Sequence, residues 1–337
     1  MIWRMVGRDD LNAMITGYRI SSALAVAADL GLSDHLSAGP RSVADLASAV
    51  SADADTLHRL LRALATLGVY RELDDGRFAN TELGEGLRSD VPWSLRPLAR
   101  TLTDPALWSA WGNLGHSVRT GDNSFSALHG VDVWAHRQAV PEQNAIFNAN
   151  MTALSSMVAD AVAVGYDFAH LSSVVDVGGG QGVLLEAVLA RHEHLTGTVF
   201  DLSHVVAHAP SADASESVAS RWSAVSGSFF DEVPTADCYL LKSVLHDWPD
   251  AECVQILRTC ARGLREGGVV LVVETLLGRP GYEAQAAFSD LNMLVLPGGR
   301  ERSEQQYAGL LEAADLQLRR VAHTSSRMSI VEARASG

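Results

Sequence analysis

The sequence predicts an α/β protein with a doubly wound, mainly parallel sheet, preceded by a helical N-terminal domain. Three observations lead to this prediction. From about residue 170, short apolar segments typical of buried strands alternate with helical segments. The first hundred residues instead show helical spacing and one short hairpin pattern. The length of 337 residues fits about two domains and can bury a large core.

The N-terminal hundred residues contain recognisable helix and hairpin signals. Ser42 and Asp53 are suited to cap two helices, the second with leucines at helical spacing, and Gly68 suits its end. The segments 69–73 and 77–79 flank a polar turn and predict a hairpin. Two helices followed by a hairpin form a winged-helix-like pattern.

A winged helix has two readings, DNA binding or a scaffold for dimerisation. In residues 1–100, eleven arginines are outnumbered by thirteen Asp and Glu residues. Since a DNA-binding domain usually presents a basic face, dimerisation is the favoured interpretation. The net charge of −14 for the whole chain also disfavours nucleic-acid partners.

The remainder of the chain is expected to run from helices into alternating strands and helices. Residues 92–165 are expected to form longer helices. Strands are expected over 174–177, 198–201, 222–225, 236–242 and 269–274, helices over 183–191, 253–264 (stopped by Gly267 and Gly268) and 307–314, and a closing hairpin over 318–321 and 329–333. Ligands of such sheets bind beyond the carboxyl ends of the strands, so functional residues should follow strand ends.

A glycine-rich loop follows the first expected strand of the sheet. Residues 176–182 read Asp-Val-Gly-Gly-Gly-Gln-Gly, and their spacing fits neither a dinucleotide fingerprint nor a Walker loop. Asp176 precedes the glycines and Asp201 ends the second strand. Carboxylates accept hydrogen bonds from ribose hydroxyls and an ammonium group, which fits S-adenosylmethionine. A tight turn with a solvent-facing Asp is the alternative.

His246 follows the fourth expected strand, in the segment Lys-Ser-Val-Leu-His-Asp-Trp at 242–248. Histidine titrates near neutral pH and can accept the proton of a phenol. This matters because a developing phenolate attacks a sulfonium methyl group far better than a neutral hydroxyl does. A charged neighbour must then hold the ring, and Glu274 and Glu301 are the candidates. No metal is expected.

Together these motifs resemble the class I S-adenosylmethionine-dependent O-methyltransferases of the plant caffeate type. The similarity is nearest to the bacterial members that modify polyketides and other antibiotics. It covers essentially the whole chain, in the order given by the N-terminal pattern, Pro141–Phe147, Asp176–Gly182, His246–Trp248, Asp290–Leu294 and Gly298–Ser303. The resemblance implies a Rossmann-like catalytic domain at 166–337, linking helices at 101–165 and a winged-helix-like dimerisation domain at 1–100.

The resemblance also implies roles for individual residues. His246 would be the general base, flanked by Glu274 and Glu301. The cofactor would be bound by Asp176, Gly178, Gly180, Asp201, Leu202, Ser228, Phe229, Lys242 and Ser243. An aromatic acceptor would contact Phe147, Met151, Asp247, Asn292 and Met293. The product of the cofactor would be S-adenosylhomocysteine, and the enzyme would be a homodimer whose partner subunit can close part of the pocket.

Ser228 departs from the family pattern, which usually has Asp at this place. The family Asp accepts a hydrogen bond from the adenine amino group. Serine can accept one without charge, so the contact should be weaker. Ser228 therefore predicts reduced cofactor affinity or altered chemistry, unless water compensates.

Other functions and the compartment complete the predictions. Some relatives use the bound cofactor for hydroxylation or decarboxylation, and a winged-helix regulator is a further alternative; the His246, Glu274 and Glu301 set favours methyl transfer. No apolar run reaches the length of a membrane span, and the first ten residues lack a signal-peptide-like block. Three scattered cysteines suggest neither disulfides nor a thiolate metal site. A cytoplasmic location is expected.

Overall fold

The computed structural model describes residues 7–206 and 215–335, which omits part of the N-terminal ten residues considered above. The chain divides into two compact units, Met1–Trp108 with Val140–Ala153, and Ser109–Ala139 with Leu154–Gly337. The boundaries expected from the sequence, at 1–100, 101–165 and 166–337, remain a prediction.

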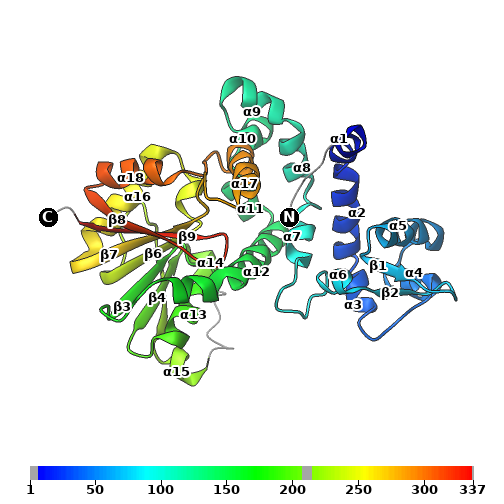
Figure 1. The fold of residues 1–337 in the computed structure, drawn as a ribbon, viewed down its shortest axis with the longest axis horizontal. Coiled ribbons are helices and arrows are strands. Elements are labelled where there is room, and N and C mark those ends of the chain that lie inside the picture. Colours follow the sequence, from blue (N-terminus) through cyan, green and yellow to red (C-terminus); the bar gives the residue numbers. More distant parts are fainter. Residues whose placement is uncertain (1–6, 207–214, 336–337) are drawn as a thin grey trace. The chain divides into compact units, whose positions relative to one another are not determined.

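The first unit contains short helices and one two-stranded hairpin (Figure 1). Its elements are α1 (Arg8–Ile15), α2 (Tyr18–Asp29), α3 (Leu32–His35), α4 (Val43–Ala49), α5 (Ala54–Thr66), β1 (Tyr70–Glu72), β2 (Phe78–Asn80), α6 (Glu82–Glu85) and α7 (Arg96–Thr101). The predicted caps are confirmed, because Ser42 accepts a bond from the Asp45 amide and Asp53 from the Thr56 amide. Gly68 follows α5 at a φ of 76°. The buried leucines of α4 and α5 pack together with Phe78. The winged-helix assignment itself stays a prediction.

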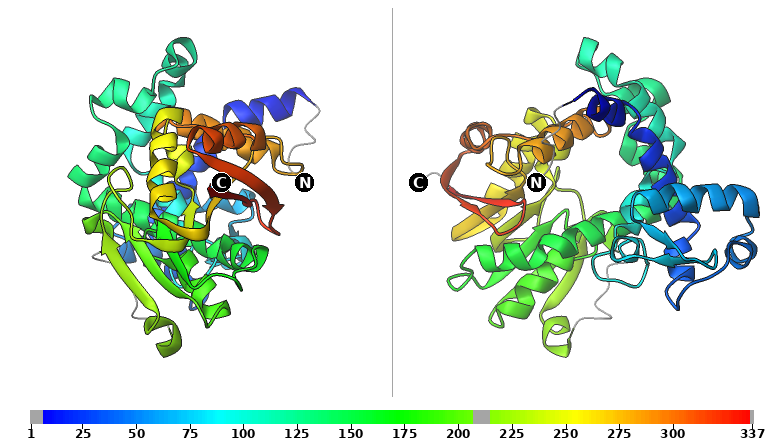
Figure 2. Two further views of the ribbon diagram at one scale, coloured as in Figure 1. Left: turned by 90° about the vertical axis from the view of Figure 1, so that its left-hand side faces the viewer. Right: turned by 45° about the vertical axis from the view of Figure 1, so that its right-hand side comes forward.

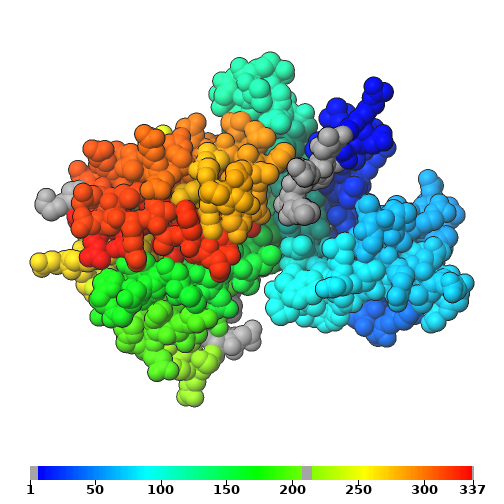
Figure 3. Space-filling model, in the orientation of Figure 1, coloured from blue at the N-terminus to red at the C-terminus, as the bar shows by residue number. Residues whose placement is uncertain are grey.

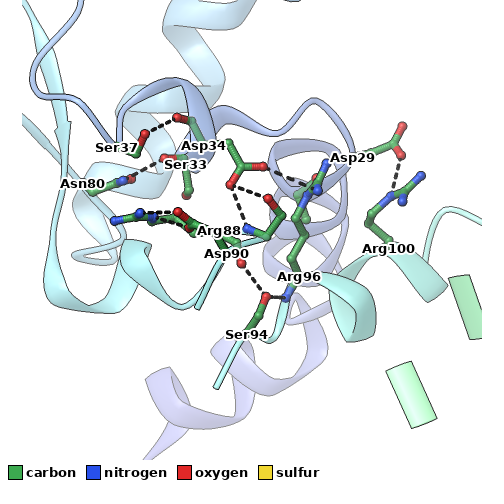
Figure 4. Close-up of polar contacts among 12 residues, drawn as sticks. Asp29, Ser33, Asp34, Ser37, Asn80, Arg88, Asp90, Ser94, Arg96 and Arg100 are labelled. Carbon is green, nitrogen blue, oxygen red and sulfur yellow. Dashed lines mark hydrogen bonds and ion pairs between the residues drawn. The ribbon is translucent and has the colours of Figure 1, made fainter. Parts of the chain in front are cut away.

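A polar network holds α2 and α3 against the chain that follows the hairpin (Figure 4). The Asp34 carboxylate accepts a 2.7 Å bond from the Ser89 amide, and Arg100 pairs with Asp29 at 3.1 Å. Arg96 donates a 2.8 Å bond to a carbonyl in the last turn of α2. Hydrogen bonds with a charged partner have strict geometry, so these contacts fix how α7 lies along α2.

A seven-stranded sheet forms the centre of the second unit (Figure 1). The strand order is β5-β4-β3-β6-β7-β9-β8. β3 to β7 are parallel, while β9 is antiparallel to both β7 and β8. The strands are β3 (Ser173–Val177), β4 (Thr196–Asp201), β5 (Trp222–Ser226), β6 (Ala236–Lys242), β7 (Leu264–Glu274), β8 (Leu316–His323) and β9 (Ser329–Ala335). The predicted doubly wound, mainly parallel sheet is confirmed.

Helices cover both faces of this sheet (Figure 2). Neighbouring residues of one strand point to opposite faces, so Val174 packs in a core with α12 and α13 while Val175 packs in a core with α16 and α18. The helices that lie wholly or partly in this unit are α8 (Pro105–Gly112), α9 (Leu114–Thr120), α10 (Ser124–His129), α11 (Val133–Ala139), α12 (Pro141–Gly165), α13 (Val183–Arg191), α14 (Ser203–Val206), α15 (Glu216–Ala219), η1 (Leu245–Asp247), α16 (Asp250–Gly263), α17 (Glu283–Val295) and α18 (Glu304–Ala313).

Two expectations about secondary structure are wrong in detail. Residues 92–165 contain one long helix, α12, whereas α7 to α11 have only six to eight residues each. Left-handed glycines at 121 and 130 end α9 and α10. The helix expected over 253–264 is α16, which ends at Gly263. Gly267 and Gly268 do not stop it, because they lie within β7, which begins where Leu264 pairs with Ala236.

The β8–β9 hairpin packs beside the end of α12. A side chain at Gly165 would lie 3.1 Å from both Ile330 and Thr324, and the Arg320 guanidinium lies 5.2 Å from the Tyr166 ring centre. In Figure 3 the red surface of the hairpin borders the green surface of this segment. Within the described ranges, no helix has both the length and the apolarity required to cross a membrane.

Candidate active site

Four parallel strands bring several of the predicted site residues to one edge of the sheet. β3 ends just before the glycine loop, β4 ends at Asp201, β6 at Lys242 and β7 at Glu274. Because these strands are parallel neighbours, their carboxyl ends share an edge. The short helix η1, which carries His246, directly follows β6 at this edge.

The glycine loop after β3 comes close to the chain after β6. Gly178 has a φ of 67°, and a Cβ there would lie 2.8 Å from Val244 Cγ2. Only glycine combines this conformation with such a close approach. Gly180, at a φ of 59°, faces open space, because a Cβ there would meet nothing within 4 Å. The backbone of Gly180 is therefore accessible to a ligand.

Two carboxylates, the buried Asp176 and the partly exposed Asp201, lie against this loop. Asp201 accepts bonds from the amides of Gly180, at 2.9 Å, and Leu202, at 2.7 Å, so the two cofactor-site loops are joined. Burial raises the pKa of Asp201. Burial also raises the pKa of Asp176 to about 7, against the attraction of Lys242. Among the described residues, nothing bonds to Asp176 Oδ2. An open glycine cradle beside carboxylate acceptors fits S-adenosylmethionine.

Lys242 and Ser243 border the same region. Burial lowers the pKa of Lys242, while the carboxylates of Asp176 and Glu274 oppose this shift. Ser243 has a φ of 55°, a strained value for a residue with a side chain. Its amide is bonded to the Val273 carbonyl at 3.1 Å, which holds the strained turn.

The residues expected at the adenine lie on the neighbouring loops. Phe229 packs edge-to-face on Trp248, and its ring would lie 3.9 Å from a Cβ at Gly178. The Ser228 hydroxyl accepts a 3.2 Å bond from the Phe230 amide. Leu202 is half exposed. The structure thus brings Phe229 beside the glycine loop and leaves Leu202 at the surface.

His246 lies against both candidate carboxylates. Its Nδ1 is 3.1 Å from Glu301 Oε1, with hydrogen-bond geometry, and 3.2 Å from Glu274 Oε2. Both glutamates are fully buried, whereas the His246 side chain is 15% exposed. Glu274 Oε1 also accepts bonds from the amides of Val244 and His246. Glu274 and Glu301 therefore hold one edge of the ring together, rather than as alternatives.

The charges of this cluster shift its proton affinities. Burial by itself would lower the pKa of His246, but Glu274, Asp247 and Glu301 raise it to about 10. Burial raises the pKa of Glu274 to about 7, although the imidazolium favours its ionised form. The protonation states of His246 and Glu274 are therefore coupled, because neutralising Glu274 removes one of the charges that stabilise the imidazolium.

Several residues that the sequence did not identify as part of the site hold this cluster in place. The Ser289 hydroxyl donates a 2.6 Å bond to Glu301 Oε1, and Asp290 accepts the Glu301 amide at 2.9 Å. Arg302 is completely buried and donates to the carbonyls of Leu245 and Trp248, which joins the His246 loop to the Glu301 loop. Only the family-like segments around 290 and 300 marked these positions in the sequence.

The same cluster offers donors for a metal ion. Ligand atoms of His246, Glu274 and Glu301 lie within 4.8 Å of one another. However, a proton on His246 Nδ1 already satisfies the Glu301 oxygen through a hydrogen bond. The expectation that the site works without a metal stays a prediction.

The residues expected to contact the acceptor fall in both units. Asp247 lies beside His246 Nε2 at 3.7 Å, and burial raises its pKa. Asn292 accepts a 3.2 Å bond from Trp111 Nε1, and Met293 is buried on the same helix, α17. Phe147 and Met151 lie on α12 in the part that belongs to the first unit, so their place in a pocket stays a prediction.

A hollow of about 390 Å³ lies elsewhere in the second unit. None of the predicted site residues lines it; its lining residues are Tyr166, Asp167, His170, Arg319, Arg320, Glu332 and Arg334.

Comparison with known proteins places this geometry in context. Residues 111–317 match the family model of an O-methyltransferase domain, and residues 13–90 match that of an O-methyltransferase dimerisation domain. The chain is 38% identical to a phenazine O-methyltransferase of Lysobacter antibioticus, over 95% of this chain and 94% of that one. It is 40% identical to a 2,7-dihydroxy-5-methyl-1-naphthoate 7-O-methyltransferase of Streptomyces carzinostaticus, over 92% and 93%.

A solved structure is similar over nearly the full length. It is an O-methyltransferase from neocarzinostatin biosynthesis in complex with S-adenosylmethionine and 2-hydroxy-5-methyl naphthoic acid. The TM-score is 0.83 and the identity 37%, with 99% of this chain and 100% of that chain covered.

Proposed function

Since this chain belongs to the O-methyltransferase family, we propose that it methylates a hydroxyl group of an aromatic small molecule with His246 as the general base. The observation that carries this proposal is the pair of buried glutamates at His246 Nδ1. Because they hold that nitrogen, Nε2 is the atom left to receive a proton.

The cofactor of this enzyme is S-adenosylmethionine, which supplies an electrophilic methyl group and leaves as S-adenosylhomocysteine. We assign its binding to the loops after β3, β4, β5 and β6. Asp201 would accept the ribose hydroxyls, and the Gly178 and Gly180 backbone would approach the methionine part. The remaining contacts would come from Asp176, Leu202, Ser228, Phe229, Lys242 and Ser243.

His246 would take the acceptor proton on Nε2 as the hydroxyl oxygen gains negative charge. Glu274 and Glu301 orient the ring through Nδ1 and stabilise the imidazolium that results. Their charges make His246 a stronger base than an isolated imidazole. A positioned base contributes about 10²- to 10⁴-fold in rate, and alignment of donor and acceptor contributes the rest.

The acceptor is proposed to be a flat phenolic compound, such as a polyketide or another secondary metabolite. Two relatives reported above act, by their names, on a phenazine and a naphthoate. In this chain, the stacked rings of Trp134 and Trp248, 6.5 Å apart, supply aromatic surface near Asp247. We assign acceptor contacts to Phe147, Met151, Asp247, Asn292 and Met293.

The chain contains a dimerisation domain over residues 13–90. We propose a homodimer formed through it, whose partner subunit closes part of the acceptor pocket. Exposed apolar side chains on α1 and α2 support this, among them Leu11, Met14, Ile15 and Tyr18. A cytoplasmic location is proposed as well, supported by three buried cysteines that are all free.

Mass spectrometry of reaction mixtures tests the proposed function. The enzyme is incubated with S-adenosylmethionine and a panel of hydroxyarenes, and each product is compared with its authentic O-methyl ether. The proposal expects a gain of one methylene unit on oxygen, together with an equal amount of S-adenosylhomocysteine. Loss of a carboxyl group or gain of an oxygen atom instead would identify decarboxylation or hydroxylation and contradict it.

A further inference from the structure

Arg327 lies in the turn between β8 and β9, at the edge of the sheet where the candidate active site lies. β9 begins at Ser329, which pairs with Glu274, the last residue of β7. The turn 324–328 therefore extends beyond the strand end that delivers Glu274. The β7–β9 pairing thus brings this residue to the strand end that carries Glu274.

The turn that carries Arg327 is held firmly. The buried guanidinium of Arg279 donates 2.7 Å bonds to the carbonyls of Met328 and Thr324, one on each side of the turn. The Thr324 hydroxyl donates a further 2.7 Å bond to the Met328 carbonyl. A side chain on such a turn is preorganised, because little backbone freedom remains to be lost when a ligand binds.

The guanidinium of Arg327 has no partner among the residues that the structure describes, although its side chain is partly buried. Glu301 attracts it without reaching ion-pair distance, and Arg327 itself disfavours the charged form of Lys242. Arg302 and Arg279, which are also buried in this region, donate to several oxygens each. A partly buried, unpaired cation is costly unless an anion completes it.

The strand order indicates which ligand supplies that anion. The loops assigned to the cofactor follow β3, β4, β5 and β6, and β7, which ends at Glu274, lies between β6 and β9 in the sheet. Arg327 therefore lies on the side of Glu274 and His246, where the acceptor hydroxyl must come. Planar guanidinium groups bind carboxylates through two parallel hydrogen bonds, which fixes orientation as well as affinity.

Building on the proposed function, we infer that Arg327 binds a carboxylate of the acceptor, so that the preferred substrates are hydroxyaryl carboxylic acids. The base is surrounded by Glu274, Glu301 and Asp247, which repel an anionic acceptor. A cation on the acceptor side of the site offsets this repulsion. It also determines which end of the acceptor points away from His246. The methionine part of the cofactor also carries a carboxylate. The experiment below distinguishes whether Arg327 binds that carboxylate or the one on the acceptor.

Binding measurements with a matched pair of probes test this inference. We would titrate 3-hydroxy-2-naphthoate and 2-naphthol into the enzyme saturated with S-adenosylhomocysteine, by calorimetry, and titrate S-adenosylhomocysteine alone separately. The wild type should bind the naphthoate at least about tenfold more tightly than the naphthol. Arg327→Gln should abolish that preference, with the affinities for 2-naphthol and for S-adenosylhomocysteine within about twofold of wild type.

Two further variants sharpen the result. Arg327→Lys should restore part of the preference, because the charge returns without the two parallel donors. Arg319→Gln, at an exposed arginine of β8 in the same hairpin, should leave all three affinities unchanged.

Absence of a preference for the naphthoate in the wild type would overturn the inference. So would an Arg327→Gln variant that loses affinity for S-adenosylhomocysteine while keeping the preference, because the arginine would then serve the cofactor carboxylate. Since these readouts need no turnover, they are independent of whether methyl transfer to oxygen is observed. Failure of the proposed function would instead appear in the product masses.

Discussion

The imidazole Nδ1 of His246 lies 3.1 Å from Glu301 Oε1, in hydrogen-bond geometry. The same carboxylate oxygen accepts the Ser289 hydroxyl, so it acts as an acceptor and the imidazole carries the proton on Nδ1. This single bond fixes both the tautomer and the direction of the ring. In the proposed reaction, His246 would therefore meet its substrate through Nε2.

Glu301→Gln should shift the pH dependence of catalysis to lower pH. The carboxylate helps to raise the pKa of His246 to about 10, and removal of its charge destabilises the imidazolium. The neutral, basic form of His246 then appears at lower pH, by about one to two units. The pH profile of kcat/KM and NMR titration of the labelled imidazole measure this shift. Glu304→Gln, at an exposed position of α18, is the matched control, and a limb that moves to higher pH would contradict the assignment.

Asp201→Ala should weaken S-adenosylmethionine binding by about tenfold or more. The carboxylate accepts the Gly180 amide and would accept the ribose hydroxyls, so its loss frees the glycine loop and removes ligand contacts. Calorimetric titration with S-adenosylhomocysteine measures the effect. Asp231→Ala, at an exposed carboxylate after β5, provides the control, and equal affinities in the two variants would refute the role of Asp201.

Ser228→Asp should tighten cofactor binding. Aspartate retains an acceptor for the Phe230 amide, which the Ser228 hydroxyl now accepts at 3.2 Å, and adds a charged acceptor for the adenine amino group. We expect a gain of several-fold, about the scale of one charge-assisted hydrogen bond. The same charge introduced by Ser220→Asp at the end of α15 should have no effect. Unchanged or weaker affinity in Ser228→Asp would reject the prediction.

Removal of divalent metal ions should leave activity within about twofold. The three groups that could bracket a metal are already joined by the Nδ1 proton of His246. Dialysis against a chelator, with turnover and metal content measured before and after, tests this expectation. Recovery of lost activity on adding zinc or magnesium would show that the cluster is a metal site.

The sequence predicted the strands and the sheet edge that carries the site, because the apolar strand segments and the polar residues that end them agree with the fold. Asp176, Asp201, Lys242 and Glu274 all lie at strand ends, where the parallel topology collects them. It could not decide between Glu274 and Glu301, and the structure has both at one nitrogen. Glu301 comes from a loop whose path depends on buried Arg302, and no local pattern encodes that contact.

Other features were beyond sequence reasoning for similar reasons. The short helices between residues 96 and 139 have apolar content typical of longer ones, and glycines and tertiary contacts end them. Arg327 shows no motif, because its position depends on pairing of β9 with β7. The Asn292 side chain, expected to contact an acceptor, is engaged by Trp111, a partner 181 residues away.

The role of His246 as the base is tested most directly by turnover of His246→Ala, with cofactor binding measured on the same preparation. We expect kcat to fall at least about 10²-fold, while the affinity for S-adenosylhomocysteine stays within about twofold. His170→Ala, at an exposed histidine before β3, should behave as wild type in both measurements. Near-normal kcat in His246→Ala would show that a group other than His246 receives the proton.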